Sequence, residues 1–164
     1  MIDIARLHAI FSIDEETGRL FWKVASKHNP SRLGREAGVC HRNRGEKRYW
    51  VIKIDGHGVN RSRIVFAMVN GRWPDPCVDH INGDSLDDRP CNLREATQQQ
   101  NNWNIKRRKK KSSLPMGVAI NRCGRFVAQI GYSGHRKSIG SFATEAEASA
   151  AYQQKRKELF GEYA

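Results

Sequence analysis

Asp79 and His80 place a carboxylate beside an imidazole within residues 78–84, and amide side chains follow at Asn92 and Asn101. Carboxylate and amide oxygens can hold a hard divalent cation. An imidazole titrates near neutral pH and can act there as a general base. Together these residue types can support metal-assisted hydrolysis of a phosphodiester. For an isolated Asp-His pair, turn formation is the simpler interpretation, so the wider sequence must decide.

The charge of the chain indicates the kind of partner. Its 164 residues have a formal net charge of +12 and an isoelectric point near 10.0. This excess favours a polyanion such as DNA, although a soluble protein with a basic surface would also show it. Residues 96–144 contain no Asp or Glu. We expect their basic side chains to face DNA phosphates; these are Lys106, Arg107, Arg108, Lys109, Lys110, Lys111, Arg122, Arg125, Arg136 and Lys137.

The segment with Asp79 and His80 resembles the HNH endonucleases of the ββα-metal fold. The resemblance is to the variant ending in Asn, which is found in phage and intron-encoded homing endonucleases. Asn92 follows His80 by twelve positions, and Asn101 follows Asn92 by nine. The wording VDHINGD, NLR and QNNWN is typical of this subgroup. The resemblance covers roughly residues 11–108.

The resemblance implies a role for each site residue. His80 would be the general base, and Asp79 and Asn101 would bind one Mg²⁺ or Mn²⁺. Asn92 would form hydrogen bonds across the hairpin loop and orient His80. Two further residues are expected to support the site, Arg94 and Asn104, of which Asn104 shares a helix face with Asn101.

Two acidic residues near the site remain open. The family often has Asp-Asn-Arg where this chain has Asp87-Asp88-Arg89, so the role of Asp88 is undefined. Asp84 could support the site, but a Gly-Asp turn explains it equally well.

Residues 115–164 resemble an AP2-type DNA-binding domain, in which a three-stranded sheet enters the major groove. The segments that carry the resemblance include GV, RFVAQI, IGSF and TEAEA. The resemblance places Asn121, Arg125, Gln129 and Arg136 at DNA-contacting positions. Arg122 and Lys137 are further candidates. The base specificity of the plant domains is not transferred, because several of their Trp and Arg positions are occupied here by Met116, Ala119, Cys123, Gly131 and Ser138.

Local patterns predict an α+β protein with a nuclease domain at 1–105, a basic linker at 106–114 and an AP2-like domain at 115–164. The predicted helices are at 2–11, 63–69, 97–109 and 144–160. The predicted strands are at 11–13, 20–24, 49–54, 117–120, 125–130 and 137–142. We expect a long loop at 26–47, a short hairpin over 77–84 and an extended loop through 89–90. Capping boxes at Thr97 and Thr144 mark two helix starts.

The four cysteines, Cys40, Cys77, Cys91 and Cys123, form no C-x-x-C pair. A zinc site at Cys77, His80 and Cys91 is a weak alternative because the spacing is irregular. The N-terminus shows no signal-peptide pattern, so we expect reduced thiols and a cytoplasmic protein. No segment approaches the ~20 apolar residues of a membrane span.

These features predict a metal-dependent DNA endonuclease, specifically a homing endonuclease of a phage or mobile element acting on double-stranded DNA in a bacterial host cell. It would be a monomer or a homodimer. One site would produce a nick, and a double-strand break would require dimerisation or two events. One alternative is a non-catalytic DNA-binding regulator on a decayed HNH scaffold. Another is a nonspecific or structure-specific nuclease in DNA repair or packaging.

Overall fold

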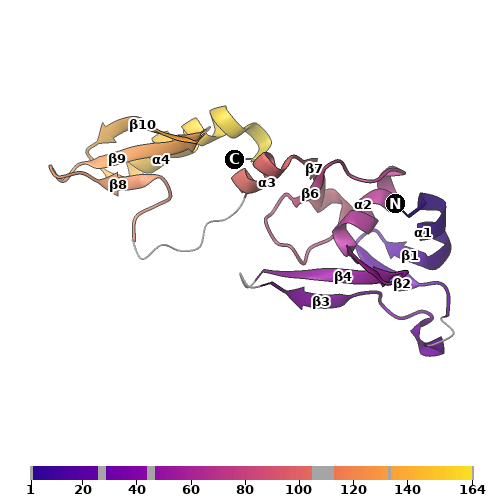
Figure 1. Cartoon of the computed structure of the whole chain (residues 1–164). Coiled ribbons are helices and arrows are strands. Elements are labelled where there is room, and N and C mark those ends of the chain that lie inside the picture. Colours follow the sequence, from indigo (N-terminus) through magenta and orange to yellow (C-terminus); the bar gives the residue numbers. More distant parts are fainter. Residues whose placement is uncertain (1, 26–28, 44–46, 105–112, 133, 164) are drawn as a thin grey trace. The chain divides into compact units, whose positions relative to one another are not determined.

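The computed structural model describes residues 2–25, 29–43, 47–104, 113–132 and 134–163 (Figure 1). The chain divides into two compact units, Met1–Asn102 and Trp103–Ala164. Both combine helices with small antiparallel sheets, so the expected mixture of α and β structure is confirmed. Within the described ranges, no helix has the length and apolar character needed to cross a membrane.

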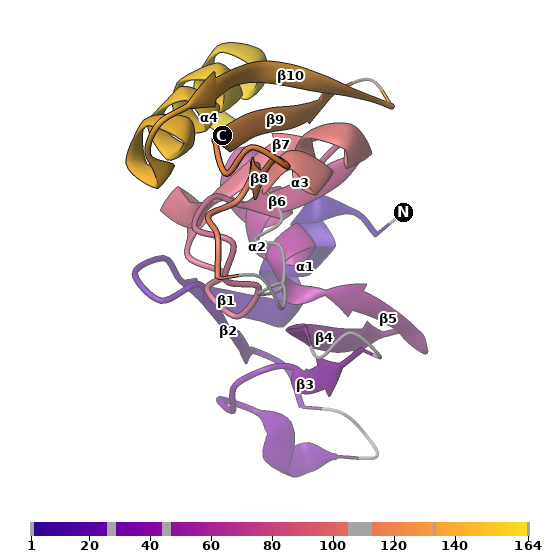
Figure 2. The same cartoon turned by 90° about the vertical axis from the view of Figure 1, so that its left-hand side faces the viewer.

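The first unit is built around one central helix. Its elements are α1 (Ile4–Ile10), β1 (Phe11–Asp14), β2 (Arg19–Trp22), η1 (Pro30–Arg32), β3 (Val39–Arg42), β4 (Arg48–Ile54), β5 (His57–Asn60), α2 (Arg61–Asn70), β6 (Cys77–His80), η2 (Pro90–Asn92), β7 (Leu93–Ala96) and most of α3 (Gln98–Asn104), whose last two residues belong to the second unit. Helix α2 contacts α1, β2, β4, β5, β6 and β7. Figure 2 shows it between the β3–β4–β5 sheet and the β6–β7 hairpin. Its buried Ile64 and Val65 pack with Leu7, Leu20 and Ile52 in the core.

Turn and capping residues mark several element ends. Asp55 and Gly56 both have positive φ, 51° and 81°, which fits the tight turn between β4 and β5. Helix α2 ends at Gly71, whose φ of 67° lies in the left-handed region. Helix α3 follows a capping box in which Thr97 N–H donates to Gln100 Oε1 at 2.7 Å and Gln100 N–H donates to Thr97 Oγ1 at 3.2 Å. The part of this helix predicted at 105–109 lies outside the described residues.

The hairpin predicted over 77–84 is wrong in extent. Strand β6 pairs with β7, so that Asp79 lies opposite Arg94 and His80 opposite Leu93. A turn does form after His80, whose carbonyl accepts Gly83 N–H at 2.8 Å. That turn leads into a loop over residues 81–89 and then into η2 instead of a returning strand. Side chains within the loop accept its backbone N–H groups, as Asn82 Oδ1 does from Asp84 at 2.8 Å and Asp84 Oδ1 from Leu86 at 3.0 Å.

The prediction of a continuous loop at 26–47 is also wrong, because it misses β3. All four residues of β3 are exposed. A strand that is exposed on both faces has no alternation of buried and exposed residues, which is the usual sequence signal. Its pairing with β4, which places Cys40 opposite Trp50, is a tertiary contact that local sequence does not reveal.

The second unit is a three-stranded sheet covered by one helix. Its elements are β8 (Val118–Ile120), β9 (Phe126–Tyr132), β10 (His135–Phe142), α4 (Glu145–Phe160) and η3 (Gly161–Tyr163). The sheet order is β10-β9-β8, antiparallel throughout. Buried Ala128 and Ile130 of β9 belong to its core, together with Ala148 and Tyr152 of α4. The predicted three strands, the final helix and the capping box at Thr144 are confirmed.

Close packing in this unit requires a glycine immediately before β8. Gly117 has φ +79°, and a Cβ at this position would lie 2.0 Å from Cδ2 of Tyr152. The first residue of this unit, Trp103, stacks on Phe160 near the end of the chain, with ring centroids 4.7 Å apart. The carbonyl of Trp103 accepts a hydrogen bond from Arg156 at 3.0 Å.

An ion pair next to the β6–β7 hairpin makes the stability of the first unit dependent on pH. Glu95 of β7 accepts two hydrogen bonds from Arg72 at 2.5 Å and one from Asp75 N–H at 2.9 Å. The hydrogen bonds from Arg72 are the main cause that lowers the pKa of Glu95 from 4.5 to about 2. A carboxyl with a lowered pKa stabilises the fold above its unfolded pKa, and this contribution is lost as the pH falls through the folded value.

We therefore expect Glu95→Gln to be less stable than the wild type at neutral pH. The difference should shrink as the pH falls below about 4.5 and be lost only when the pH falls below about 2, where Glu95 is protonated and both side chains are neutral. Urea unfolding of the full chain at a series of pH values measures it. Glu15→Gln, an exposed change in the β1–β2 turn, is the control. A difference that stays constant with pH would contradict this account of the ion pair.

Candidate active site

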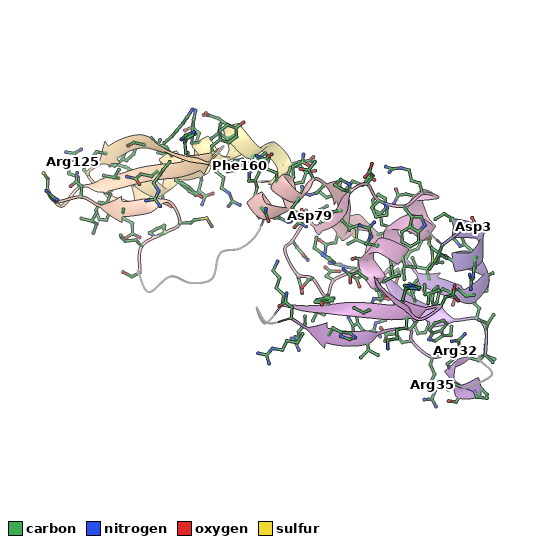
Figure 3. The ribbon with its side chains drawn as sticks, viewed as in Figure 1. Asp3, Arg32, Arg35, Asp79, Arg125 and Phe160 are labelled. Atoms are coloured by element: carbon green, nitrogen blue, oxygen red, sulfur yellow. The ribbon has the colours of Figure 1, made fainter. Side chains whose placement is uncertain are left out.

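Asp79 and His80 end strand β6, where neighbouring side chains point to opposite faces. Asp79 is 4% exposed. Its cross-strand partner Arg94 donates from Nε at 3.0 Å and from Nη2 at 2.9 Å, both to Oδ2. Figure 3 labels Asp79 in this hairpin. Arg94, predicted only to support the site, is therefore a direct partner of the carboxylate.

His80 pairs with a residue whose role the sequence left open. Its Nε2 lies 2.9 Å from Oδ1 of Asp88. Asp88 is 1% exposed, and its other oxygen, Oδ2, accepts a hydrogen bond from Nε of Arg61 at 2.8 Å. The only signal in the sequence was that Asp88 stands where the resembled family often has Asn.

Arg61 brings a second carboxylate into the same network. The side chain of Arg61 is 3% exposed, and its Nη1 donates to Oε1 of Glu36 at 2.7 Å. Its guanidinium carbon lies 4.5 Å from the ring centroid of Trp50. Buried charges are retained when they are paired and hydrogen-bonded, and Arg61 has a carboxylate on two sides and an aromatic face against its plane. Glu36, Trp50 and Arg61 were not predicted as site residues.

Asn92 closes the loop that carries Asp88. It is 6% exposed, and its Oδ1 accepts Asn82 N–H at 3.0 Å. Its Nδ2 donates to Asn82 Oδ1 at 3.1 Å and to the carbonyl of Asp87 at 2.7 Å. Its own carbonyl accepts Ile81 N–H at 2.9 Å. These hydrogen bonds join both ends of the loop, so Asn92 contacts the residues that follow His80 and precede Asp88.

The two remaining predicted residues of the site lie on α3. Asn101 is partly exposed, and its backbone N–H donates to Thr97 O at 2.9 Å. Asn104 groups with the second unit. Helix α3 comes directly after β7 in the chain, so Asn101 lies on the element that follows the β6–β7 hairpin, which carries Asp79.

Asp79 and Asn101 suit a hard cation, because both offer oxygen and one carries charge. Among the described residues, no group of three or more His, Cys, Asp or Glu could hold a metal ion. A cation here would therefore take its other oxygens from water or a phosphate. The zinc alternative gains no support, since Nε2 of His80 faces Asp88 and Cys91 is exposed.

In the second unit, strand register collects three of the predicted DNA-binding residues on one face. Arg125 and Gln129 alternate along the chain with Ala128 and Ile130, which are buried. Arg136 lies opposite Gly131. Gly131 is two positions after Gln129 in β9 and therefore lies on the same face as Gln129. Cross-strand partners share a face, so all three lie on the side opposite the buried residues. Figure 3 shows Arg125 at the end of the sheet away from Phe160.

The other predicted DNA-binding residues are placed differently. Oδ1 of Asn121 accepts Cys123 N–H at 2.9 Å and Arg125 N–H at 3.0 Å, so this oxygen closes the β8–β9 turn. Arg122 is exposed in that turn. Lys137 lies opposite Ile130 and so falls on the other face from Arg136. Lys106, Arg107, Arg108, Lys109, Lys110 and Lys111 lie outside the described residues.

Loss of the Asn92 side chain should open the loop that follows His80. Asn92→Ala would remove the hydrogen bonds to the backbone groups of Asn82 and Asp87, each worth about 0.5–1.5 kcal/mol net. We expect a lower urea midpoint for the full chain. Asn102→Ala on the exposed face of α3 is the matched control and should change stability little. Equal midpoints for the two variants would show that Asn92 does not hold the loop.

Comparisons with known proteins agree with the geometry of this segment. Residues 60–103 match the HNH endonuclease family. An uncharacterized HNH endonuclease of Acanthamoeba polyphaga mimivirus is 35% identical over 104 residues, which cover 62% of this chain and 54% of the viral protein. The chain thus spans about half the length of that relative. No solved structure matches this chain significantly. The segment that is similar to HNH endonucleases, residues 60–103, therefore includes Arg61, Asp79, His80 and Asp88.

Proposed function

We propose that this protein is a metal-dependent endonuclease that hydrolyses a phosphodiester bond of double-stranded DNA. One observation carries the proposal. An imidazole held by a buried carboxylate, His80 with Asp88, stands next to the buried carboxylate of Asp79, within the segment that matches HNH endonucleases. A base beside a hard-cation ligand is what hydrolysis of this bond needs.

Each residue has a distinct task in the proposed reaction. His80 accepts a proton from the attacking water, while a new oxygen–phosphorus bond forms and the bond to the leaving 3′ oxygen breaks. Asp79 and Asn101 would hold one Mg²⁺ or Mn²⁺, which when bound stabilises charge on the phosphate and the leaving oxygen. Arg94 fixes the carboxylate of Asp79. Asn92 maintains the loop that joins His80 to Asp88.

The second unit would supply DNA affinity and the choice of site. Its sheet carries Arg125, Gln129 and Arg136 on one face, which fits an AP2-like domain that lays a sheet in the major groove. The net charge of +12 supports binding to a polyanion. Residues 106–111, all Lys or Arg, would add contacts to phosphates.

This arrangement suits a homing endonuclease of a phage or other mobile element, acting in the cytoplasm of a bacterial host. A specific DNA-binding unit joined to one cutting unit would select few positions in a long DNA. A monomer would produce nicks, and a homodimer would produce paired cuts.

His80→Ala should abolish cleavage and leave DNA binding unchanged, because it removes the base and no phosphate contact. General acid–base groups contribute on the order of 10²–10⁴-fold in rate. A plasmid-nicking assay with Mg²⁺ or Mn²⁺ measures cleavage, and a gel-shift assay with the same DNA measures binding. His8→Ala, an exposed change on α1, is the matched control. Cleavage retained by His80→Ala would remove His80 from the role of base.

The wild-type result separates the other functions from the proposed one. DNA binding without cleavage in either metal would indicate a regulator on an HNH scaffold. Cuts scattered along a long DNA from the protein's own genomic neighbourhood would indicate a nonspecific nuclease. A single mapped position would support the homing function.

Arg136→Ala should weaken DNA binding and lower its salt dependence, because it removes one positive charge from the face of the sheet. The slope of log affinity against log salt should fall by about 1. Lys157→Ala removes the same charge from the exposed surface of α4 and is the control. If both variants lose affinity equally, net charge and not this face governs binding.

A further inference from the structure

We infer that Asp88 is a positioning residue that determines which ring nitrogen of His80 carries the proton. It holds the proton on Nε2, which leaves the lone pair of the neutral ring on Nδ1. This inference rests on the proposed function, because it assigns Nδ1 as the atom that takes the proton from water. Asp88 itself would not touch the substrate; it acts through His80.

The hydrogen-bond partners of Asp88 fix the direction of each bond. Arg61 has only N–H donors and no acceptor, so Oδ2 of Asp88 accepts from Arg61 Nε at 2.8 Å. The second oxygen, Oδ1, lies 2.9 Å from Nε2 of His80. An ionised carboxylate is only an acceptor, and a neutral imidazole has one donor and one acceptor nitrogen. The bond between them therefore requires the proton on Nε2.

Arg61 is itself held so that it cannot turn away from Asp88. Its Nη1 donates to Glu36 Oε1 at 2.7 Å, and its plane lies against Trp50 with 4.5 Å from the guanidinium carbon to the ring centroid. It is also the first residue of α2, and the buried residues of this helix from Ile64 to Met68 are part of the core. The donor that faces Oδ2 of Asp88 is thus fixed by contacts from three parts of the first unit.

The backbone of Asp88 is held from another side by the β1–β2 turn. Gly18 in this turn has φ +69°, and a Cβ there would lie 2.1 Å from the carbonyl oxygen of Asp88 and 2.2 Å from its carbonyl carbon. No other residue permits this approach. Asp88 is therefore fixed through both its side chain and its main chain, as a positioning residue must be.

Because Arg61 can only donate, an amide in place of the Asp88 carboxylate is expected to change the tautomer of His80 in this chain. In Asp88→Asn the carbonyl oxygen would turn to Arg61, because Arg61 can only donate. The amide NH₂ would then face Nε2 of His80, which would have to accept, and the ring proton would move to Nδ1. The substitution changes few atoms but reverses the tautomer and removes the basic lone pair from Nδ1.

The test reads the tautomer directly, in the full chain without DNA or metal. Nitrogen NMR of ¹⁵N-histidine-labelled protein, at a pH well above the ordinary titration range of imidazole, distinguishes a ring protonated on Nε2 from one protonated on Nδ1. Comparison with His80→Ala assigns the signals of His80. We expect Nε2–H in the wild type and Nδ1–H in Asp88→Asn. The control Asp87→Asn removes the same charge from a neighbour that contacts Arg89 and Asn82, and it should keep Nε2–H.

Cleavage measurements complete the test. Asp88→Asn should lower kcat on the order of 10²–10⁴-fold, with KM for DNA changed less than about twofold, because the variant alters the base and no binding surface. Asp87→Asn should keep most of its activity.

Two results would overturn the inference: a wild-type His80 protonated on Nδ1, or an Asp88→Asn ring that stays protonated on Nε2. The first needs no variant, so misfolding of Asp88→Asn would not prevent the decision. If the wild type cuts no DNA but its His80 carries the proton on Nε2, the proposed function fails while the assignment of the tautomer stands.

Discussion

The guanidinium of Arg61 is the charge on which the rest of the first unit depends. It is buried between Asp88 and Glu36 at hydrogen-bonding distances and lies against Trp50. Taking such ions out of water costs several kcal/mol each, and only close pairing offsets this cost. Removing Arg61 would leave the buried carboxylate of Asp88 without its cationic partner. One network therefore serves two purposes: it joins α2 to the sheet below it, and it orders the loop beside His80.

Much of the local structure could be predicted, because it follows from patterns within a few residues. The capping boxes at Thr97 and Thr144 and the turn at Asp55 are defined by near neighbours in the sequence. The spacing of Asp79, His80 and Asn92 likewise selected the segment that matches HNH endonucleases. Strand β3 escaped prediction because all its residues are exposed.

The partner of His80 could not be predicted, because it is selected by contacts distant in sequence. Arg61 is 27 positions from Asp88 and 25 from Glu36. The sequence neighbour Arg89 would be the obvious partner for the carboxylate of Asp88. In the structure, however, Arg89 pairs with Asp87. Residue type also did not distinguish Asn121 from its neighbours. Its oxygen closes a turn, whereas strand register alone places Arg125 and Arg136 on a common face.

The close approach of Gly18 to Asp88 has a consequence for the limits of a minimal catalytic fragment. The family match begins at residue 60, but Gly18, Glu36 and Trp50 all precede it. A fragment cut at that boundary would keep Asp79 and His80 and lose every contact that encloses Arg61 and the backbone of Asp88 from the N-terminal side. The motif can be recognised by itself in sequence. As a physical object it cannot be transplanted alone, and a functional graft into another protein would have to carry the first two hairpins with it.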